Sequence, residues 1–294
     1  MAEVQIRNTL VGDSHPCYVI AEIGINHNGD IDLAKRIIDI AIAAGCNAVK
    51  FQKRTIEIVY SEEELARPRE SPFGDTNRAL KYGLEFELDE YRAIDDYCRE
   101  KKITWFASCW DEGSVDFIEQ FDVPCYKIAS ASLTDDKLLL HTREKGRPII
   151  LSTGMSTLEQ IDHAVDMLGK DDLIIVHSCS TYPAYYEELN LRVIQTLKQR
   201  YSVPVGYSGH ETGIASSVAA VALGACMIER HVTWDRSTWG SDHAASLEPN
   251  GITRLIHDIR LVETSMGDGI KRVIEREVPV MKKLRRIDDR SKIL

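Results

Sequence analysis

Four motifs of the 294-residue sequence place charged or metal-binding side chains among apolar residues. AVKFQK and CYKIAS carry Lys50 and Lys127, and GYSGH and ERHVT carry His210 and His231. Ammonium groups bind phosphates and carboxylates, and imidazole is a common ligand of divalent metals. Each residue also has an ordinary explanation, because a strand lysine is often ion-paired or extends its head to water, and a lone histidine is often a hydrogen-bonded core residue. Together the four motifs would require four separate coincidences, and they favour a site for a small anion, while the two histidines taken alone are more often hydrogen-bonded core residues than metal ligands.

The segment AEIGINHNGD, residues 21–30, adds a carboxylate to this set. It directly follows the apolar run CYVI, and Asn28-Gly29 is an ordinary turn dipeptide that explains the end of a strand. Glu22 is different, because it lies inside the apolar run, where an unpaired carboxylate is costly. We expect Glu22 to take part in chemistry or to pair with a lysine across the fold, and the two roles are compatible.

Eight apolar runs typical of buried strands recur along the chain, at residues 17–25, 48–53, 104–110, 125–130, 148–154, 173–179, 203–209 and 226–233. Between them, patterns such as DLAKRIIDIAIAAG and LEQIDHAVDMLGK space apolar residues three and four apart, as helices do. Strands that are apolar throughout and alternate with helices indicate a parallel sheet covered on both faces. The sequence therefore predicts an α/β protein with a (β/α)8 TIM barrel.

Polar residues stand at the end of every predicted strand. They are Glu22, Asn26 and His27, then Lys50 and Gln52, Ser108, Lys127 and Ser130, Ser152 and Thr153, His177 and Ser178, Tyr207, Ser208 and His210, and finally Glu229 and His231. In a barrel these ends meet at one mouth, where barrel enzymes build their active sites. A strand-end serine or threonine taken singly is more often a turn or helix cap. The convergence of all eight sets favours a catalytic site.

Two connections, residues 54–85 and 180–189, exceed ordinary loop lengths and follow strands, so we expect both to border this mouth. The segment 266–294 is charged and has no strand pattern. We therefore predict one barrel domain over residues 1–265 and a linker or exposed helix over residues 266–294.

Composition excludes several classes of protein. The formal net charge of −10 argues against a general binder of nucleic acid or anionic membranes. No stretch approaches the length of a membrane span, and MAEVQIRNTLVGD lacks the features of a signal peptide. Seven cysteines without a Cys-x-x-Cys pair mostly occupy apolar runs, which favours reduced, buried thiols. We expect a cytoplasmic protein.

The motifs VIAEIGINHNGD, AVKFQ, YKIAS, ILSTGM, VGYSGH, ERHVT and SDHAASLEP, in this order, resemble the sialic acid (N-acetylneuraminate) synthase family. The resemblance extends from about residue 18 to about residue 283. It implies a (β/α)8 barrel that condenses phosphoenolpyruvate with an N-acetylhexosamine-type aldose, a manganese or magnesium cofactor, release of phosphate, and a homodimer. The family also carries a C-terminal antifreeze-like domain, which we expect to be missing here.

The resemblance assigns roles to individual residues of this sequence. It implies a catalytic role for Glu22, metal ligation and a catalytic role for His210 and His231, and substrate contacts for Lys50, Gln52, Ser108, Lys127, Ser130, Ser152, Tyr186 and Asp242. The lysines and serines match positions for the phosphoenolpyruvate anion, and Gln52, Tyr186 and Asp242 match positions on the sugar side. Ser108 lies in FASCWDE, which departs from the commoner form of that segment. Ser132 stands where the family often has a glutamate, so the sugar pocket is expected to differ.

The resemblance also implies a reaction. The metal makes the aldehyde carbon electrophilic, C3 of phosphoenolpyruvate attacks it, water adds at C2, and phosphate leaves to give a nonulosonic acid. Three alternatives remain open from the sequence: a 3-deoxy-octulosonate or 3-deoxy-heptulosonate synthase, which needs a second phosphate site usually marked by arginines; a sugar-binding relic without catalysis; and a Schiff-base aldolase that uses Lys127.

Overall fold

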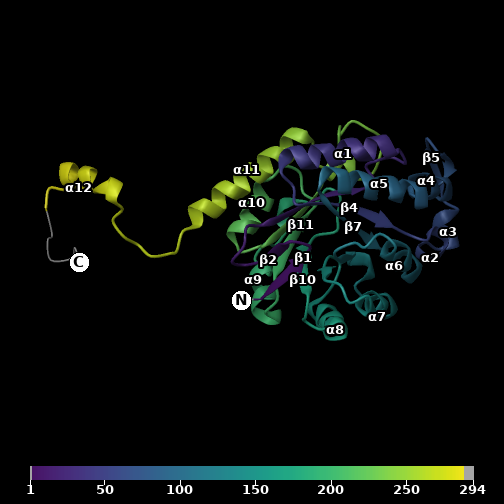
Figure 1. Cartoon of the computed structure of the whole chain (residues 1–294), viewed down its shortest axis with the longest axis horizontal. Helices are drawn as coiled ribbons and strands as arrows, with labels where there is room; N and C mark the ends of the chain where they lie inside the picture. The colour runs from purple at the N-terminus through teal and green to yellow at the C-terminus, as the bar shows by residue number, and fades with distance from the viewer. Residues whose placement is uncertain (1, 288–294) are drawn as a thin grey trace.

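In the computed structural model, which describes residues 2–287, eight parallel strands close into a barrel (Figure 1). These strands are β3 (Tyr18–Gly24), β4 (Ala48–Lys53), β7 (Thr104–Cys109), β8 (Tyr126–Ile128), β9 (Ile149–Ser152), β10 (Leu173–Ser178), β11 (Val205–Gly209) and β12 (Met227–His231). Each strand pairs with the next along the chain, and β12 closes the barrel on β3. The predicted (β/α)8 fold is confirmed, and each predicted apolar run contains one barrel strand.

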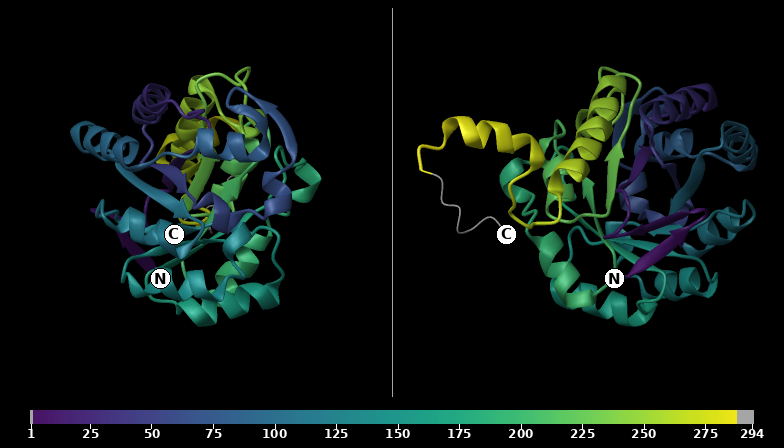
Figure 2. Two further views of the ribbon diagram at one scale, coloured as in Figure 1. Left: turned by 90° about the vertical axis from the view of Figure 1, so that its right-hand side faces the viewer. Right: turned by 60° about the vertical axis from the view of Figure 1, so that its left-hand side comes forward.

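An outer layer of helices surrounds the strands (Figure 2). It consists of α1 (Ile31–Ala44), α5 (Leu88–Lys101), α6 (Glu112–Glu119), α7 (Asp136–Glu144), α8 (Leu158–Leu168), α9 (Val193–Tyr201), α10 (Ala215–Ala222) and α11 (Pro249–Met266). In α1 the buried residues Ala34, Ile37, Ile38 and Ala41 form one stripe, because three- and four-residue steps return to the same helix face. This stripe packs on the sheet and buries the outer face of the strands.

Two hairpins outside the barrel are not among the predicted elements. β1 (Glu3–Ile6) pairs with β2 (Thr9–Gly12) ahead of the first barrel strand. Its residues Val4, Ile6 and Val11 join the hydrophobic core, and Arg7 donates a hydrogen bond to the carbonyl oxygen of Asp122, just before β8. The hairpin therefore covers the amino-terminal end of the barrel, opposite the predicted site.

The segment 54–85 is folded, not an open loop. It contains α2 (Ile56–Val59), α3 (Glu62–Leu65), a hairpin of β5 (Pro68–Ser71) and β6 (Gly74–Thr76), and α4 (Asn77–Leu84). The shorter connection, residues 180–189, contains the 3-10 turn η2 (Tyr186–Glu188) and forms a bridge from Ala184 to Glu211. Both segments follow the carboxyl ends of barrel strands, as predicted.

The chain after α11 leaves the barrel and extends away from it (Figure 1). Residues 267–274 form neither helix nor strand, and they are followed by the 3-10 turn η4 (Glu275–Glu277) and by α12 (Val278–Leu284), which buries none of its residues. Part of the predicted tail, residues 288–294, lies outside the described residues. Within residues 2–287 no helix is both long and apolar enough to cross a membrane.

A buried ion pair lies behind β12, on the helix side of the barrel wall. Arg230 and Glu211 are both fully buried, and Nη1 of Arg230 lies 3.2 Å from Oε1 of Glu211. Ser217 and Tyr207 donate further hydrogen bonds to the same carboxylate at 2.9 and 2.8 Å. The arginine also donates to the carbonyl oxygen of Gly213 at 2.8 Å, so the pair holds the backbone that follows His210.

We expect Arg230→Met to lower the free energy of unfolding by about 3–5 kcal/mol, because it leaves the Glu211 carboxylate buried without its cation. Urea denaturation at neutral pH measures this loss. Arg254→Met is the matched control: Arg254 forms an exposed ion pair with Asp258 on α11, which water already solvates, and its removal should leave the unfolding midpoint almost unchanged. A loss below about 1 kcal/mol for Arg230→Met, typical of an exposed pair, contradicts the prediction.

Candidate active site

A polar cavity of about 170 Å³ opens at the carboxyl ends of the barrel strands. Its lining includes all the predicted site residues except Tyr186 and Asp242. The lining residues are Glu22, Lys50, Gln52, Ser108, Trp110, Lys127, Ala129, Ser130, Ala131, Ser152, Met155, Ser180, Tyr182, Ser208, His210, Glu229 and His231. The two-residue period of a strand explains the convergence, since Lys50 and Gln52, or Glu229 and His231, point to the same face. In larger cavities elsewhere the charged lining residues are exposed or half-buried, whereas here they are buried.

Four charged side chains form an alternating row across the cavity, which we call the charge row: Glu22, Lys50, Glu229 and Lys127. Nζ of Lys50 lies 3.0 Å from Oε2 of Glu22 and 3.5 Å from Oε1 of Glu229, and Nζ of Lys127 lies 3.4 Å from the same Glu229 oxygen. Ser208 donates to that oxygen at 3.1 Å. The expected pairing of Glu22 with a lysine is therefore present, although the partner is on the neighbouring strand and not across the barrel.

Burial and neighbours set the protonation of the charge row. Burial lowers the pKa of Lys127 to about 8, and the nearby Glu229 carboxylate only partly offsets this effect. Burial also opposes the charge of Lys50, but the carboxylates of Glu22 and Glu229 outweigh it and raise the pKa of Lys50. Burial disfavours the Glu229 anion too, yet Lys127 and Lys50 hold its pKa below the ordinary value. The row thus presents two ammonium groups to the cavity near neutral pH.

Serine hydroxyls gather beside this row at Gly154. The N–H of Gly154 donates to Oγ of Ser130 at 3.0 Å, and Oγ of Ser130 lies 3.3 Å from Oγ of Ser178. A Cβ atom on Gly154 would lie 2.2 Å from Oγ of Ser180 and 2.8 Å from Oγ of Ser130, so only glycine lets these hydroxyls converge. Together with Ser152, they form a set of donors suited to a tetrahedral oxyanion.

The two predicted metal ligands, His210 directly after β11 and His231 at the end of β12, lie on adjacent strands and face one another. The ring centroids of His210 and His231 are 5.4 Å apart. Nδ1 of His210 lies 2.6 Å from the carbonyl oxygen of Cys179, which can only accept, so Nδ1 carries the proton and Nε2 keeps its lone pair. Burial, with a smaller contribution from His231, lowers the pKa of His210 to about 3, and the ring is neutral.

This histidine pair has the chemistry of a metal-binding site. A neutral imidazole whose second nitrogen is fixed by a carbonyl is the usual form of a histidine ligand. Nδ1 of His231 is buried without a hydrogen-bond partner, and Oδ2 of Asp242 lies 3.6 Å from it. Within residues 2–287, no group of three or more His, Cys, Asp or Glu side chains is placed to hold a metal ion. A cation here would depend on two imidazoles, with substrate or water completing its coordination.

Asp242 lies beside the cavity and not in its lining. It precedes the 3-10 turn η3 (His243–Ala245) in the connection after β12, and its carboxylate receives a hydrogen bond from Ser241 at 2.8 Å. Its position next to His231 places it where it can orient that ring or meet a ligand beyond it. The predicted sugar contact of Asp242 stays a prediction.

Tyr186 lies outside the lining of the cavity. Its side chain is 61% exposed, and its hydroxyl donates to the carbonyl oxygen of Thr212 at 3.1 Å. The tyrosine that lines the cavity is Tyr182, whose ring centroid lies 4.1 Å from that of His210 and 5.6 Å from that of His231. The path of the 180–189 segment brings Tyr182 over the imidazoles and turns Tyr186 toward solvent, and the predicted sugar contact of Tyr186 stays a prediction.

Glu229 is the main site residue that the sequence did not assign. It stands at a predicted strand end, in ERHVT, but receives no role there. Two lysines and one glutamate inside apolar strands leave the charges unbalanced, and this imbalance was a signal for a second buried carboxylate. Trp110 and Ser180 also line the cavity from residues that follow strands, and nothing in their local sequence distinguishes them from ordinary loop residues.

The closed parallel barrel, with a polar cavity at the carboxyl ends of its strands, defines a (β/α)8-barrel enzyme. The chain belongs to the NeuB family, whose profile matches residues 37–271. This result confirms the resemblance to the sialic acid synthase family.

Individual relatives cover most of the chain. N-acetylneuraminate-9-phosphate synthase of Homo sapiens is 42% identical over 280 residues, covering 93% of this chain and 78% of the human protein. N,N'-diacetyllegionaminic acid synthase of Legionella pneumophila is 35% identical over 285 residues, covering 94% of this chain and 80% of its own length. The crystal structure of N-acetylneuraminic acid (sialic acid) synthetase from Leptospira borgpetersenii, in complex with citrate, matches with a TM-score of 0.85 and 32% identity, over 97% of this chain and 98% of that one.

Proposed function

We propose that this protein is a nonulosonic acid synthase: it condenses phosphoenolpyruvate with an aldose of the N-acylhexosamine class and releases phosphate. One observation carries the proposal: the charge row, the serine hydroxyls at Gly154 and the histidine pair all line one cavity at the barrel mouth. Membership of the NeuB family and the relatives named as synthases of sialic and legionaminic acids support the same reaction class.

The anionic half of the site suits phosphoenolpyruvate. Lys50 and Lys127 supply two ammonium groups, and the serines near Gly154 supply neutral donors, so a carboxylate and a phosphate can be held at once. Both ammonium groups are oriented by Glu229, which keeps them fixed before the anion arrives. Such prepositioned donors stabilise negative charge without reorganisation during the reaction.

The other half of the site suits an aldehyde. His210 and His231 would hold a divalent cation, manganese or magnesium, which supplies Lewis-acid polarisation of the aldehyde carbonyl when bound. The reaction forms a bond between C3 of phosphoenolpyruvate and the aldehyde carbon, adds water at C2, and expels phosphate to leave a 2-keto acid. The Glu22 carboxylate lines the same cavity from β3, and there it can stabilise positive charge at C2 or accept the proton that the added water loses.

Phosphate release tests the proposal. The protein is incubated with phosphoenolpyruvate, Mn²⁺ or Mg²⁺, and one aldose at a time: N-acetylmannosamine, its 6-phosphate, 2,4-diacetamido-2,4,6-trideoxymannose, mannose, arabinose 5-phosphate and erythrose 4-phosphate. We expect phosphate release with at least one N-acylated hexose and formation of a nine-carbon 2-keto acid, measured by mass spectrometry. Turnover of the two short phosphorylated aldoses alone would instead indicate an octulosonate or heptulosonate synthase. If no aldose is turned over, the remaining hypothesis is a sugar-binding protein without catalytic activity.

The residues of the cavity argue against an octulosonate-type synthase and against a Schiff-base aldolase. Among the described residues, the cavity lining contains no arginine that marks a second phosphate site of the octulosonate type. A Schiff-base lysine needs an uncharged amine, and Lys127, although its pKa is about 8, is held between a carboxylate and the anion donors. We expect borohydride with pyruvate to give no adduct on Lys127.

The proposal includes a homodimer and a cytoplasmic location. The projecting α12 exposes Val280 and Leu284 to solvent, and a second copy of the chain would cover such an apolar face. The free cysteines favour the cytoplasm, where thiols are kept reduced. Sedimentation equilibrium measures the dimer directly.

A further inference from the structure

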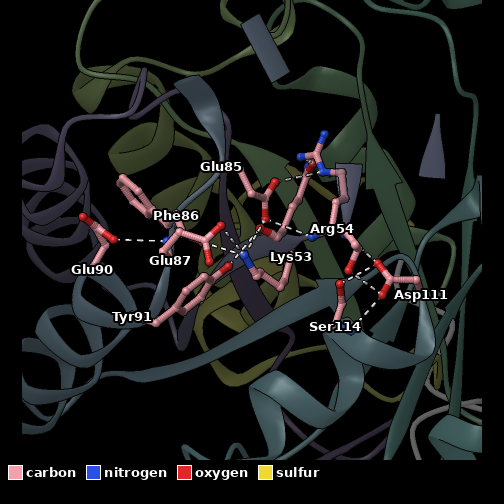
Figure 3. Close-up of polar contacts among 11 residues, drawn as sticks. Lys53, Arg54, Glu85, Phe86, Glu87, Glu90, Tyr91, Asp111 and Ser114 are labelled. Carbon is pink, nitrogen blue, oxygen red and sulfur yellow. Dashed lines mark hydrogen bonds and ion pairs between the residues drawn. The ribbon is translucent and has the colours of Figure 1, made fainter. Parts of the chain in front are cut away.

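Arg54 lies immediately after β4, beside the catalytic cavity but outside its lining. Its side chain is only 7% exposed, and it packs 5.2 Å from the ring centroid of Trp110, which does line the cavity. A buried guanidinium needs partners for its charge and its five N–H donors, because removing it from water is otherwise unfavourable. Figure 3 shows it among the polar residues that join the end of β4 to the start of α5.

One arm of the guanidinium reaches back to the strand it follows. Nη2 of Arg54 donates a short hydrogen bond to Oε1 of Gln52. Nε2 of Gln52 in turn donates to Oε1 of Glu22 at 2.6 Å, and Oε2 of Glu22 lies 3.0 Å from Nζ of Lys50. The arginine is therefore the outer end of a hydrogen-bonded chain that ends on the Glu22 carboxylate.

The rest of Arg54 is held by the folded segment 54–85. Nη1 donates to the hydroxyl of Tyr60 at 3.0 Å, Nε lies 3.7 Å from Oε2 of Glu85, and the backbone N–H of Arg54 donates to Oε1 of Glu85 at 2.9 Å. Glu85 is buried, and Lys53 also pairs with it, at 3.3 Å (Figure 3). Tyr60 and Glu85 thus fix the guanidinium and the backbone of Arg54, in addition to its contact with Gln52.

We propose that Arg54 is a positioning residue for catalysis: by fixing the side-chain amide of Gln52, it holds the Glu22 carboxylate in its place in the cavity. This inference deepens the proposed synthase function and rests on it for its kinetic consequences. Arg54 touches neither the cavity nor the reacting atoms, and its effect passes through Gln52.

The chemistry of an amide explains why the arginine is needed. A glutamine side chain can turn by about 180°, which exchanges its acceptor oxygen and its donor nitrogen. An arginine donates only, so its contact with Oε1 forces the NH₂ group of Gln52 toward Glu22. Without this contact, only the Glu22 carboxylate still favours that orientation, and the amide oxygen of Gln52 loses the donor that fixes its position. Glu22 then has one fixed partner, Lys50, in place of two.

Arg54→Met tests the inference against a matched control. Methionine keeps much of the buried stem but has no donor, and we expect kcat to fall about 10- to 100-fold, the size of effect that follows from misplacing a catalytic group. The KM for phosphoenolpyruvate should change by less than about threefold, since both cavity lysines remain. Lys53→Met removes the other cation beside Glu85 without touching Gln52, and it should retain most of the wild-type kcat.

Arg54→Lys separates charge from geometry. A lysine restores the positive charge near Glu85, but its compact ammonium lacks the planar fork with which Nη1 and Nη2 of Arg54 reach Tyr60 and Gln52. We expect it to recover the melting temperature while kcat stays low. Equal loss of kcat in Lys53→Met and Arg54→Met, or full recovery of kcat by lysine, overturns the inference and leaves Arg54 as a structural cation.

A double-mutant cycle with Gln52→Leu asks whether the effect passes through the amide. If the effect of Arg54 passes through Gln52, adding Arg54→Met to Gln52→Leu lowers kcat by no more than about twofold. The reason is that the effects of substitutions at two contacting residues do not add. Multiplication of the two single effects contradicts the inference.

A crystal structure of Arg54→Met gives a readout that does not depend on activity. We expect Nε2 of Gln52 to move beyond 3.5 Å from Oε1 of Glu22, the limit of a hydrogen bond, and persistence of the 2.6 Å contact overturns the inference. A wild-type protein that releases no phosphate with any aldose would refute the proposed synthase, while this structure would still decide whether Arg54 positions Gln52 and Glu22.

Discussion

His231→Ala should lower kcat/KM for the condensation by at least about 100-fold and leave the fold intact. Lewis-acid polarisation of a carbonyl is worth several kcal/mol, and about 1.4 kcal/mol corresponds to each factor of ten. His231 is the last residue of β12, and its Nδ1 has no hydrogen-bond partner in the protein. Its removal therefore takes away a proposed metal ligand without breaking a hydrogen bond of Nδ1.

The measurement combines kinetics with direct metal binding. Calorimetric titration of Mn²⁺ into the wild type and His231→Ala should show weaker binding by the variant, and circular dichroism should show a similar melting temperature. The control is His177→Gln, because His177 is also buried at a strand end but donates to the carbonyl oxygen of Leu189, outside the cavity lining. If His231→Ala keeps more than about a tenth of wild-type activity at saturating metal, ligation by His231 is wrong, since losing a ligand costs at least that factor.

The barrel could be predicted because its strands are buried on both faces. All six residues of β10 and all seven of β3 are buried, so the sequence must be apolar without alternation, and this leaves eight recognisable runs. The same reasoning could not find the β5–β6 hairpin. Its strands read PRES and GDT and are mostly exposed, so their pairing leaves no hydrophobic pattern.

The site residues that lie on barrel strands could be predicted from the sequence. Lys50 and Glu22 lie opposite one another in the β3–β4 register, and His231 lies opposite Glu22 in the β12–β3 register, so strand order and period bring these three together. Tyr182 could not be distinguished from its neighbours in STYPAYYEE. A connection without periodicity gives no rule for which tyrosine turns inward, and only the backbone path decides.

The role of Arg54 also could not be predicted from the sequence. The sequence identifies a cation directly after a strand, but its role depends on Tyr60, six residues further along, and on Glu85, which returns to it from the far end of the segment 54–85. Contacts of that kind are set by the fold of α2, α4 and the hairpin, not by local spacing. Hydrogen-bonded support around a site is therefore harder to predict than the residues that line it.

Lys127→Met is expected to raise the KM for phosphoenolpyruvate about 10- to 100-fold and to change the KM for the sugar far less. A hydrogen bond to a charged group is worth roughly 1.5–3 kcal/mol, and about 1.4 kcal/mol is tenfold in affinity. Methionine keeps the apolar stem. Glu229 keeps its contacts with Lys50 and Ser208, so the fold should survive.

The pH profile gives this prediction a second, independent part. Because burial lowers the pKa of Lys127 to about 8, the free enzyme loses this ammonium as the pH rises above that value. The wild-type kcat/KM for phosphoenolpyruvate, which reports the free enzyme, should therefore fall about tenfold per unit of pH on the alkaline side. The Lys127→Met profile should lack this limb.

Lys198→Met controls for the loss of any ion-paired lysine, because Lys198 pairs with Asp13 at 2.7 Å and donates to the carbonyl oxygen of Gly224, away from the cavity lining. It should leave both Michaelis constants and the alkaline limb unchanged. Equal increases of the two Michaelis constants in Lys127→Met, or an alkaline limb that persists in it, would show that Lys127 does not hold the phosphoenolpyruvate anion. Lys50 and the serines at Gly154 would then have to bind it, and the pair of Lys127 with Glu229 would have a structural role alone.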